Sequence, residues 1–369
     1  MKKLLFGAYS LDIGGIEKAL VILVNKLQEK GYDITLVLEK KQGIFLNEID
    51  PKIKIIEYAP SNGKNKIQRK IINLIKKIKF ILKYKNKYDF SASFATYSLP
   101  SSFIARTASK NCYLWGHADY LTLFDGNAEE MKEFFIERNY DKFKKIIFVS
   151  KEGKDSFIKV FPEMKEKTMV CNNLIDANKI LELSKEKIPE EDLSKINKLE
   201  NTQKETTIFI NVGRHQEKQK KLSRLIEAAT MLKKDNMNFK IIFIGDGPET
   251  EEYKKQVKNN QLENNIIFLG KKQNPYPYFK IADCVVLTSD YEGYPVVFLE
   301  SFILEKPIIT TKVSDYKEVE NKYGFVTEKD TKDIYEKMKN FILNGFEIKE
   351  KFDYKKYNEE ILKKIENLF

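Results

Sequence analysis

Two glutamates eight positions apart are the side chains of this chain best suited to bind a polar ligand. Glu292 and Glu300 lie in residues 282–311, ADCVVLTSDYEGYPVVFLESFILEKPIITT. Glu292 precedes a predicted helix, where an acidic side chain also interacts favourably with the helix macrodipole without any ligand. Glu300 stands between apolar residues inside that helix, so its carboxylate either faces solvent or accepts hydrogen bonds from ligand hydroxyl groups. The residues alone leave these alternatives open.

Basic residues form a second candidate site. Arg214 follows Gly213 at the end of an apolar run, and Lys218, Lys220 and Lys221 come next, before an apolar helix. Cations at the end of a strand, beside a helix N-terminus, form a favourable site for anions such as phosphate groups. An exposed basic loop without a ligand is the alternative.

The N-terminal half supplies further candidates. Gly14 and Gly15 follow the first predicted strand, and such a pair is typical of a tight turn. The pattern G-x-G-x-x-G is absent there, which counts against a dehydrogenase. His117 follows another predicted strand at its carboxyl end, a usual position for ligand-binding residues, although a packed or capping histidine is the alternative. Asp119 is either a hydrogen-bond partner of His117 or a cap for the next turn.

Short apolar strands that alternate with helices must position these residues. The run from Cys284 to Leu287 is β-branched and unbroken, which predicts a strand covered on both faces of a parallel sheet. A turn around Gly293, a helix over 296–304 and a strand over 307–311 complete a βαβ unit. Further strands are predicted at 3–10, 33–39, 88–94, 111–117, 145–150, 206–212, 239–245, 266–270 and 324–328. The alternation predicts an α/β fold, and 369 residues are enough for two domains.

The chain resembles, over nearly its whole length, the family 4 (group 1) retaining glycosyltransferases of the bacterial capsule and cell-surface polysaccharide type. The run E-G-Y-P-V-V-F-L-E followed by K-P-I-I is similar to the E-x7-E signature of that family. The run N-V-G-R-H-Q-E-K-Q-K-K is similar to its G-R-x-x-x-x-K-G passage, G-G-I-E-K-A-L to its Gly-rich first loop, and G-D-G-P to a turn of the second domain. One departure is Glu305, where the family usually has Gly before Lys-Pro.

The resemblance implies a GT-B fold, in which two Rossmann-like domains face each other across a cleft. Residues 1–170 would bind the acceptor, residues 171–350 the nucleotide-sugar, and residues 351–369 would form a helix that crosses back to the first domain. By resemblance the catalytic residues are His117, near the transferred sugar, and Glu292, on its hydroxyl groups. The donor-binding residues implied in the same way are Gly14, Gly15, Arg214, Lys220, Gly293, Tyr294 and Glu300. Lys218 competes with Lys220 as the phosphate-binding lysine.

The resemblance also implies a reaction. A hexose or related sugar would pass, with retention, from a UDP- or GDP-linked donor to a saccharide or polyprenyl-diphosphate-linked acceptor in cell-surface polysaccharide synthesis. No D-x-D motif occurs, so no metal ion and no further cofactor are expected. The alternatives are a GT-B-fold sugar-nucleotide epimerase and a non-catalytic protein that binds a membrane surface.

The net charge of +11 belongs to the N-terminal half, because residues 1–175 hold 31 Lys and Arg against 20 Asp and Glu. Lys64 to Lys87 carries ten basic residues and no acidic one, with apolar residues at helical spacing. Such a helix either packs on the sheet with a solvated basic face or docks on an anionic membrane surface. Nucleic acid is not expected, because no binding module is recognisable.

The same composition suggests where the protein works. The three cysteines lack metal-type spacing, which suits reduced thiols in a cytosol. No apolar run is long enough to span a membrane, and Asp12 and the Gly-Gly turn argue that the N-terminus is a strand rather than a signal peptide. A cytoplasmic protein, peripheral on the inner face of the plasma membrane, is the expectation.

Overall fold

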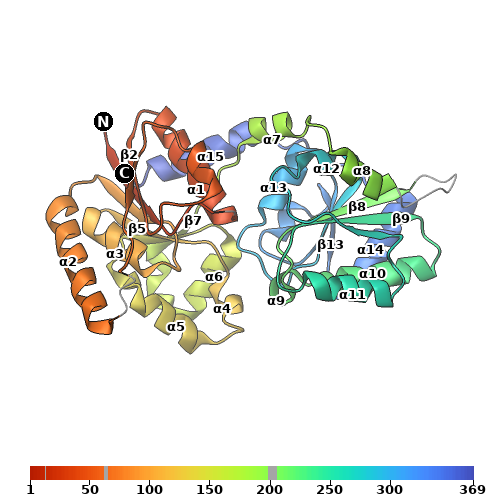
Figure 1. The fold of residues 1–369 in the computed structure, drawn as a ribbon, viewed down its shortest axis with the longest axis horizontal. Helices are drawn as coiled ribbons and strands as arrows, with labels where there is room; N and C mark the ends of the chain where they lie inside the picture. Colours follow the sequence, from red (N-terminus) through yellow and green to blue (C-terminus); the bar gives the residue numbers. More distant parts are fainter. Residues whose placement is uncertain (13, 62–64, 198–205) are drawn as a thin grey trace. The chain divides into compact units, whose positions relative to one another are not determined.

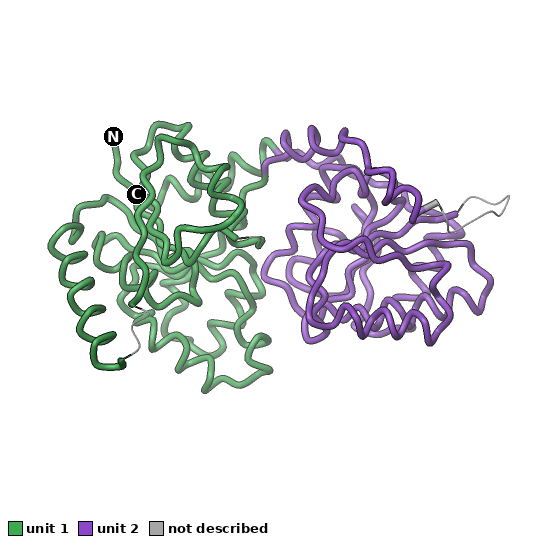
Figure 2. The backbone as a smooth tube through the Cα atoms, viewed as in Figure 1, with its two compact units in different colours: residues 1–175, 355–369 green, residues 176–354 purple. Residues whose placement is uncertain are grey.

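The computed structural model describes residues 1–12, 14–61, 65–197 and 206–369. The chain divides into two compact units (Figure 2): unit 1 is residues 1–175 with 355–369, and unit 2 is residues 176–354. The sequence-based domain limit lay between residues 170 and 171, five residues before the limit between these units. Figure 1 labels the helices and strands for which it has room.

Within the described residues, unit 1 holds a seven-stranded parallel sheet in the order β3-β2-β1-β4-β5-β6-β7. The strands are β1 Lys3–Ala8, β2 Asp33–Leu38, β3 Lys54–Glu57, β4 Phe90–Ser93, β5 Cys112–Gly116, β6 Lys145–Phe148 and β7 Thr168–Val170. The central strands are buried along nearly their whole length, as expected for a parallel sheet covered by helices. The sheet therefore brings the carboxyl ends of β1, β4 and β5 side by side.

The helices of unit 1 connect these strands, except for the last one, which follows unit 2 in the chain. They are α1 Gly15–Glu29, α2 Lys66–Tyr84, α3 Leu99–Ala108, α4 Tyr120–Leu123, α5 Ala128–Glu137, α6 Lys151–Val160 and α15 Tyr354–Glu366, with 3-10 turns η1 Ile44–Glu48, η2 Tyr140–Lys142 and η3 Pro162–Lys167. The last helix belongs to unit 1 although it follows unit 2 in the chain. Its end is held by Leu368, whose carbonyl accepts hydrogen bonds from Asn111 Nδ2 at 2.8 Å and Tyr113 Oη at 2.9 Å.

In the described part of unit 2, a six-stranded parallel sheet runs in the order β10-β9-β8-β11-β12-β13. The strands are β8 Thr207–Val212, β9 Phe239–Ile244, β10 Ile266–Phe268, β11 Cys284–Leu287, β12 Ile308–Thr311 and β13 Gly324–Thr327. The helices are α7 Ala177–Leu183, α8 Glu190–Asn197, α9 Glu217–Lys220, α10 Leu222–Lys234, α11 Thr250–Asn259, α12 Tyr276–Ile281, α13 Val296–Ile303 and α14 Thr331–Asn344, with η4 Tyr316–Glu318. In Figure 1, α12 and α13 lie on one face of this sheet and α10, α11 and α14 on the other.

Helix α2 does not fit one of the two sequence-based alternatives, in which its apolar side packs on the sheet. Its isoleucines and leucines are exposed to solvent, except for the half-buried Ile81, and only Phe80 is buried. The alternative in which these apolar side chains pack on the sheet is therefore wrong. Lys64, the first residue of the predicted basic segment, lies outside the described residues. Within the described residues, no helix combines the length and apolar composition needed to cross a membrane.

Candidate active site

The loop between β11 and α13 carries Glu292 at the carboxyl end of the sheet of unit 2. Buried hydroxyl groups hold this loop in place. Thr311 Oγ1 donates to the Ser289 carbonyl and Ser314 Oγ to the Glu292 carbonyl, both at 2.6 Å. Because neighbouring chain segments bond its backbone, the loop presents Glu292 in a defined position, as a preorganised site requires.

Glu292 is the acceptor of three hydrogen bonds from side chains. Its Oε1 accepts from Lys220 Nζ at 2.6 Å and from Ser289 Oγ at 2.7 Å, and its Oε2 accepts from Gln219 Nε2 at 3.2 Å. The Lys220 and Glu292 side chains are only 20% and 10% exposed. A carboxylate this deeply buried needs such partners, because the charge has lost most of its contact with water.

Lys220 reaches Glu292 because β8 and β11 are neighbours in the sheet. The loop after β8 forms the short helix α9, and Lys221 then adopts a left-handed conformation with φ +48°. Thr288 Oγ1 donates to the carbonyls of Lys220 and Lys221 at 2.9 and 3.0 Å, and Asp290 N donates to Gln219 O at 2.8 Å. The two loops, about 70 residues apart in sequence, therefore form one connected surface.

The other basic residues of this loop take different positions. Arg214 and Lys218 are exposed, while the Lys220 stem passes over Gly213 and its amine bonds Glu292. The geometry favours Lys220 over Lys218 as the lysine of the site. Sequence reasoning missed Arg224, whose Nη1 donates to Asp290 Oδ1 at 2.5 Å in the same loop as Glu292.

Glu300 is buried, and this settles one alternative. Its side chain is on α13 but does not face solvent, since the residue is 6% exposed and Tyr276 Oη of α12 donates to its Oε1 at 3.0 Å. Tyr294, at the start of α13, is also buried and donates to Glu318 Oε2 at 2.9 Å. Gly293 lies between Tyr294 and Glu292, partly buried. The sequence contained no signal for the Tyr276 or Glu318 contacts.

His215 is part of the scaffold. It is fully buried, its Nδ1 lies 2.8 Å from Thr250 Oγ1, and burial lowers its pKa. The turn after β9 packs directly against its backbone, so that a Cβ on Gly247 would lie 2.0 Å from the His215 carbonyl oxygen and one on Gly245 1.8 Å from that of Gly213. The glycines of this G-D-G-P turn are needed for close approach between two loops.

In unit 1, His117 follows β5 directly. Its ring packs on Phe94 with centroids 4.5 Å apart, and its Nε2 is buried without a hydrogen-bond partner among the described residues. Burial lowers the pKa of His117 to about 3, although a hydrogen bond with the Phe94 backbone acts in the opposite direction. The imidazole is therefore neutral at physiological pH. Asp119 is not its partner, because this carboxylate caps α4 through Thr122 N and Oγ1.

Gly14 and Gly15 form the start of α1, after β1. Gly14 is the N-cap residue and has an extended backbone, and a Cβ there would meet only the flexible Glu17 carboxylate at 2.1 Å. A Cβ on Gly15 would point into open space. The fold of unit 1 does not itself demand glycine at position 15. Within the described residues, no group of three or more His, Cys, Asp or Glu side chains is placed to hold a metal ion.

Comparison with known proteins adds sequence and fold relationships. Residues 193–359, most of unit 2, match the family of glycosyl transferases group 1. The sequence is 26% identical over 243 residues to the uncharacterized glycosyltransferase MJ1059 of Methanocaldococcus jannaschii. This alignment covers 66% of this chain and 58% of that protein. It is 24% identical over 325 residues to the Campylobacter jejuni N-acetylgalactosamine-N,N'-diacetylbacillosaminyl-diphospho-undecaprenol 4-alpha-N-acetylgalactosaminyltransferase, 84% of this chain and 81% of that one.

The chain thus spans about three fifths of the length of the first relative, and its alignments with two further relatives span 33% of each. Among solved structures, Anabaena Alr3699/HepE in complex with UDP and glucose has a TM-score of 0.77 at 18% identity, covering 99% of this chain and 100% of that one. The chain therefore has the GT-B fold, and its second unit is similar to the glycosyl transferases of group 1.

Proposed function

We propose that this protein is a retaining glycosyltransferase that moves a hexose or related sugar from a nucleotide-sugar to a saccharide or lipid-linked saccharide. The observation that carries the proposal is the buried Lys220–Glu292 pair at the carboxyl ends of β8 and β11. This edge of an open parallel sheet is where ligands bind in α/β folds. A cation and a carboxylate fixed side by side match a donor that has both phosphate and sugar hydroxyl groups.

In the proposed reaction, a bond forms between an acceptor oxygen and the anomeric carbon of the sugar. The bond between that carbon and the diphosphate breaks, and the diphosphate oxygen keeps the electron pair. Lys220 and Arg214 stabilise the negative charge that develops there, in the place that a metal ion takes in other enzymes. The acceptor loses its proton, and the departing diphosphate or solvent takes it up.

The remaining candidates have supporting roles. Glu292 orients the sugar through its hydroxyl groups, and Glu300, buried beside Tyr276, accepts from the ribose. Gly293 and Tyr294 fix the loop at the start of α13, and Gly14 and Gly15 leave room for the donor phosphates. His117, neutral and short of one hydrogen-bond partner, is suited to contact a sugar hydroxyl.

The substrates are proposed by similarity. UDP is the favoured nucleotide, because HepE was solved with UDP and glucose and S. aureus TarM with UDP. GDP remains the alternative. The Campylobacter relative acts on a diphospho-undecaprenol saccharide, and a Staphylococcus relative is a poly(ribitol-phosphate) N-acetylglucosaminyltransferase. A lipid-linked or polymeric saccharide of the cell surface is therefore the proposed acceptor, reached at the cytoplasmic face of the plasma membrane.

The test is sugar transfer from a panel of UDP- and GDP-sugars to lipid-linked saccharides, with wild type and Glu292→Gln. Loss of a preorganised polar contact at the reacting group predicts a 10²- to 10³-fold lower rate, on the order of 3–4 kcal/mol. Glu251→Gln, on the exposed side of α11, is the matched control and should keep full activity. Equal activity of Glu292→Gln and wild type would refute the proposed role of Glu292. Isomerisation of the sugar nucleotide without an acceptor would indicate an epimerase. A lack of turnover with every donor would indicate a non-catalytic binding protein.

A further inference from the structure

Helix α2 of unit 1 exposes an apolar stripe. The side chains that form it are Ile67, Ile71, Leu74, Ile75, Ile78 and Leu82, all between 45% and 76% exposed. At 100° per residue these positions cover one side of the helix, and that side faces away from the sheet. A contiguous apolar face of this length on a protein surface marks a contact with a partner or a membrane.

The helix does not need the stripe for its attachment to unit 1. Phe80, on the opposite side, is 4% exposed and packs against Tyr58 and Phe103 with ring centroids 5.3 and 6.0 Å away. Tyr84 of the same helix extends this aromatic group to Tyr88, since its ring centroid lies 4.8 Å from that of Phe80 and 6.5 Å from that of Tyr88. Since these aromatic side chains fasten the helix, the exposed isoleucines and leucines are available for something else.

Lysines border the stripe on both sides. Lys70 and Lys77 lie along one border and Lys79 along the other, while Lys83 lies about 40° further round the helix, toward Phe80. All four are exposed, and residues 66–84 contain no Asp or Glu. Within the described part of the chain, neither Lys79 nor Lys83 has an acidic partner. A solvated helix surface normally mixes both signs of charge, whereas this one has positive charges alone.

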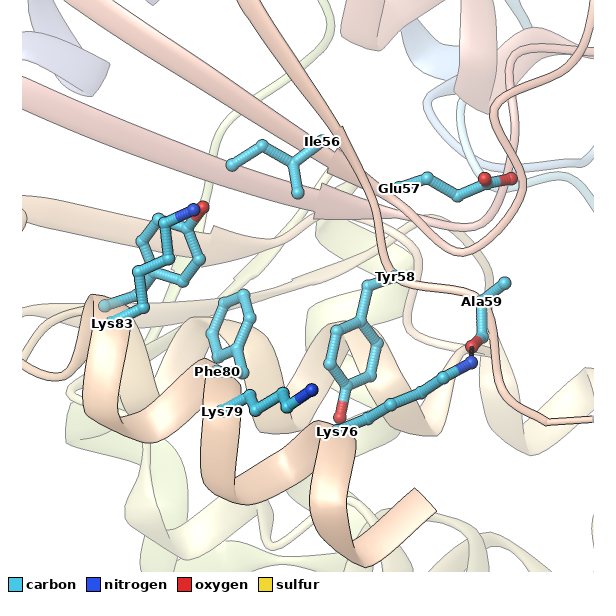
Figure 3. Close-up of a pocket in the computed structure, with 9 residues that line it drawn as sticks. Ile56, Glu57, Tyr58, Ala59, Lys76, Lys79, Phe80 and Lys83 are labelled. Atoms are coloured by element: carbon cyan, nitrogen blue, oxygen red, sulfur yellow. Dashed lines mark hydrogen bonds between the residues drawn. The ribbon is translucent and has the colours of Figure 1, made fainter. Parts of the chain in front are cut away.

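A pocket of about 320 Å³ opens between α2 and β3, on the side of Lys79 and Lys83. Ile56, Tyr58 and Phe80 give the pocket an apolar interior. Figure 3 shows Lys76, Lys79 and Lys83 extending from the helix along one side of the pocket. Lys76 Nζ donates to the Ala59 carbonyl at 2.6 Å and is therefore engaged. Glu57, also at the pocket, accepts from Lys41 N at 3.0 Å. The amines of Lys79 and Lys83 remain for an anion at the mouth of the pocket.

We infer that α2 is a membrane-docking helix that lies in the plane of an anionic bilayer. The stripe enters the boundary between headgroups and acyl chains, and Lys79 and Lys83 bind lipid phosphate groups at the pocket. Interfacial helices have this combination of an apolar side with flanking lysines. A second copy of this chain fits less well, because two such helices would bring lysine rows together. Nucleic acid would leave the isoleucines uncovered.

This inference rests on the proposed membrane location, but its test does not depend on sugar transfer. The full-length protein is mixed with one of two kinds of vesicle, pure phosphatidylcholine or phosphatidylcholine with about 30% phosphatidylglycerol. The fraction of protein bound is measured by flotation. We expect binding to the anionic vesicles only, weakened by salt. Lys79→Gln with Lys83→Gln should weaken it about 25-fold, at about fivefold per lysine near the surface. The control, Lys234→Gln with Lys258→Gln on exposed positions of unit 2, should bind as wild type.

A second variant tests the stripe itself. Ile67→Gln, Leu74→Gln and Ile78→Gln together replace exposed side chains, so the fold is retained and vesicle binding should fall at least about tenfold. Leu343→Gln, an exposed leucine of α14, is the matched control. Equal binding of the triple variant and wild type would overturn the inference. So would a dimer in light scattering that the same triple substitution dissociates, because the stripe would then bind a second copy.

Discussion

Breaking the buried ion pair between Lys220 and Glu292 should destabilise unit 2 and uncouple the two loops that form the candidate site. Lys220→Met removes the ammonium group but keeps most of the apolar stem over Gly213. Glu292 would then keep its bonds from Ser289 and Gln219, which carry no charge. The carboxylate would remain 90% buried with no counter-ion at 2.6 Å.

The magnitude follows from the burial of the pair. Removing one partner of a fully buried ion pair costs about 3–5 kcal/mol, because the other charge is left uncompensated. The Lys220 side chain retains 20% exposure, and Glu292 keeps two neutral donors, so about 2–3 kcal/mol is expected here. Lys220→Met combined with Glu292→Gln removes both charges and should lose less than the sum of the single variants, with a coupling energy of about 1–2 kcal/mol.

The assay is urea unfolding of the full chain, with hydrogen exchange at β11 and α13 to locate the effect in unit 2. The control is Lys254→Met, which removes an exposed ion pair of similar length, Lys254 Nζ to Glu251 Oε1 at 2.8 Å. This change should alter the unfolding free energy by less than about 1 kcal/mol. Additive effects in the double variant, or a Lys220→Met effect no larger than the control, would refute the reasoning.

Three further predictions concern single positions. Glu305 adopts φ +53°, so Glu305→Gly should raise the unfolding free energy by about 1 kcal/mol in urea unfolding, and a loss of stability would contradict this. Tyr276→Phe leaves the buried Glu300 carboxylate without its 3.0 Å donor and should cost about 1–3 kcal/mol, measured in the same way; an unchanged midpoint would argue that the bond is unimportant. The folded-state pKa of His117, about 3, lies below the unfolded value of about 6.5, so its contribution to stability is complete above pH 6.5 and is lost as pH falls from there toward 3. Between pH 7 and 5, the unfolding free energy of wild type should therefore fall by about 1–2 kcal/mol more than that of His117→Gln. Parallel pH profiles of the two unfolding free energies would exclude this.

Strands with strong local signals could be predicted from the sequence. The limits of β11, Cys284–Leu287, match the prediction because an apolar β-branched run between turn residues is visible without any knowledge of its neighbours. The edge strand β3, Lys54–Glu57, was not predicted. Its four residues begin and end with charged side chains and are partly exposed, so they show no apolar run.

Helix α2 shows what periodicity leaves undetermined. The spacing of isoleucines and leucines predicted the helix and identified the residues that share one side of it. It did not indicate whether the sheet or solvent covers that side. The packing was decided by Phe80, whose aromatic partners Tyr58 and Phe103 lie outside the helix.

The candidate site depends on contacts that are distant in sequence. Lys218 and Lys220 were equivalent by composition, and only the adjacency of β8 and β11 places Lys220 against Glu292. In the same way, Glu300 is buried because α12 brings Tyr276 to it. The left-handed Glu305 explains why glycine is usual at that position in the family that the sequence resembles.

The most direct test of the proposed donor site is calorimetric titration of UDP and GDP into wild type, Lys220→Met and Glu292→Gln. We predict that wild type binds one of the two nucleotides and that Lys220→Met binds it about 10- to 100-fold more weakly, because one charge-assisted hydrogen bond to phosphate is lost. Glu292→Gln should bind it at least as tightly as wild type, since this change releases Lys220. Equal affinity of wild type and Lys220→Met, or no binding of either nucleotide by wild type, would contradict the assignment of this loop as the donor site.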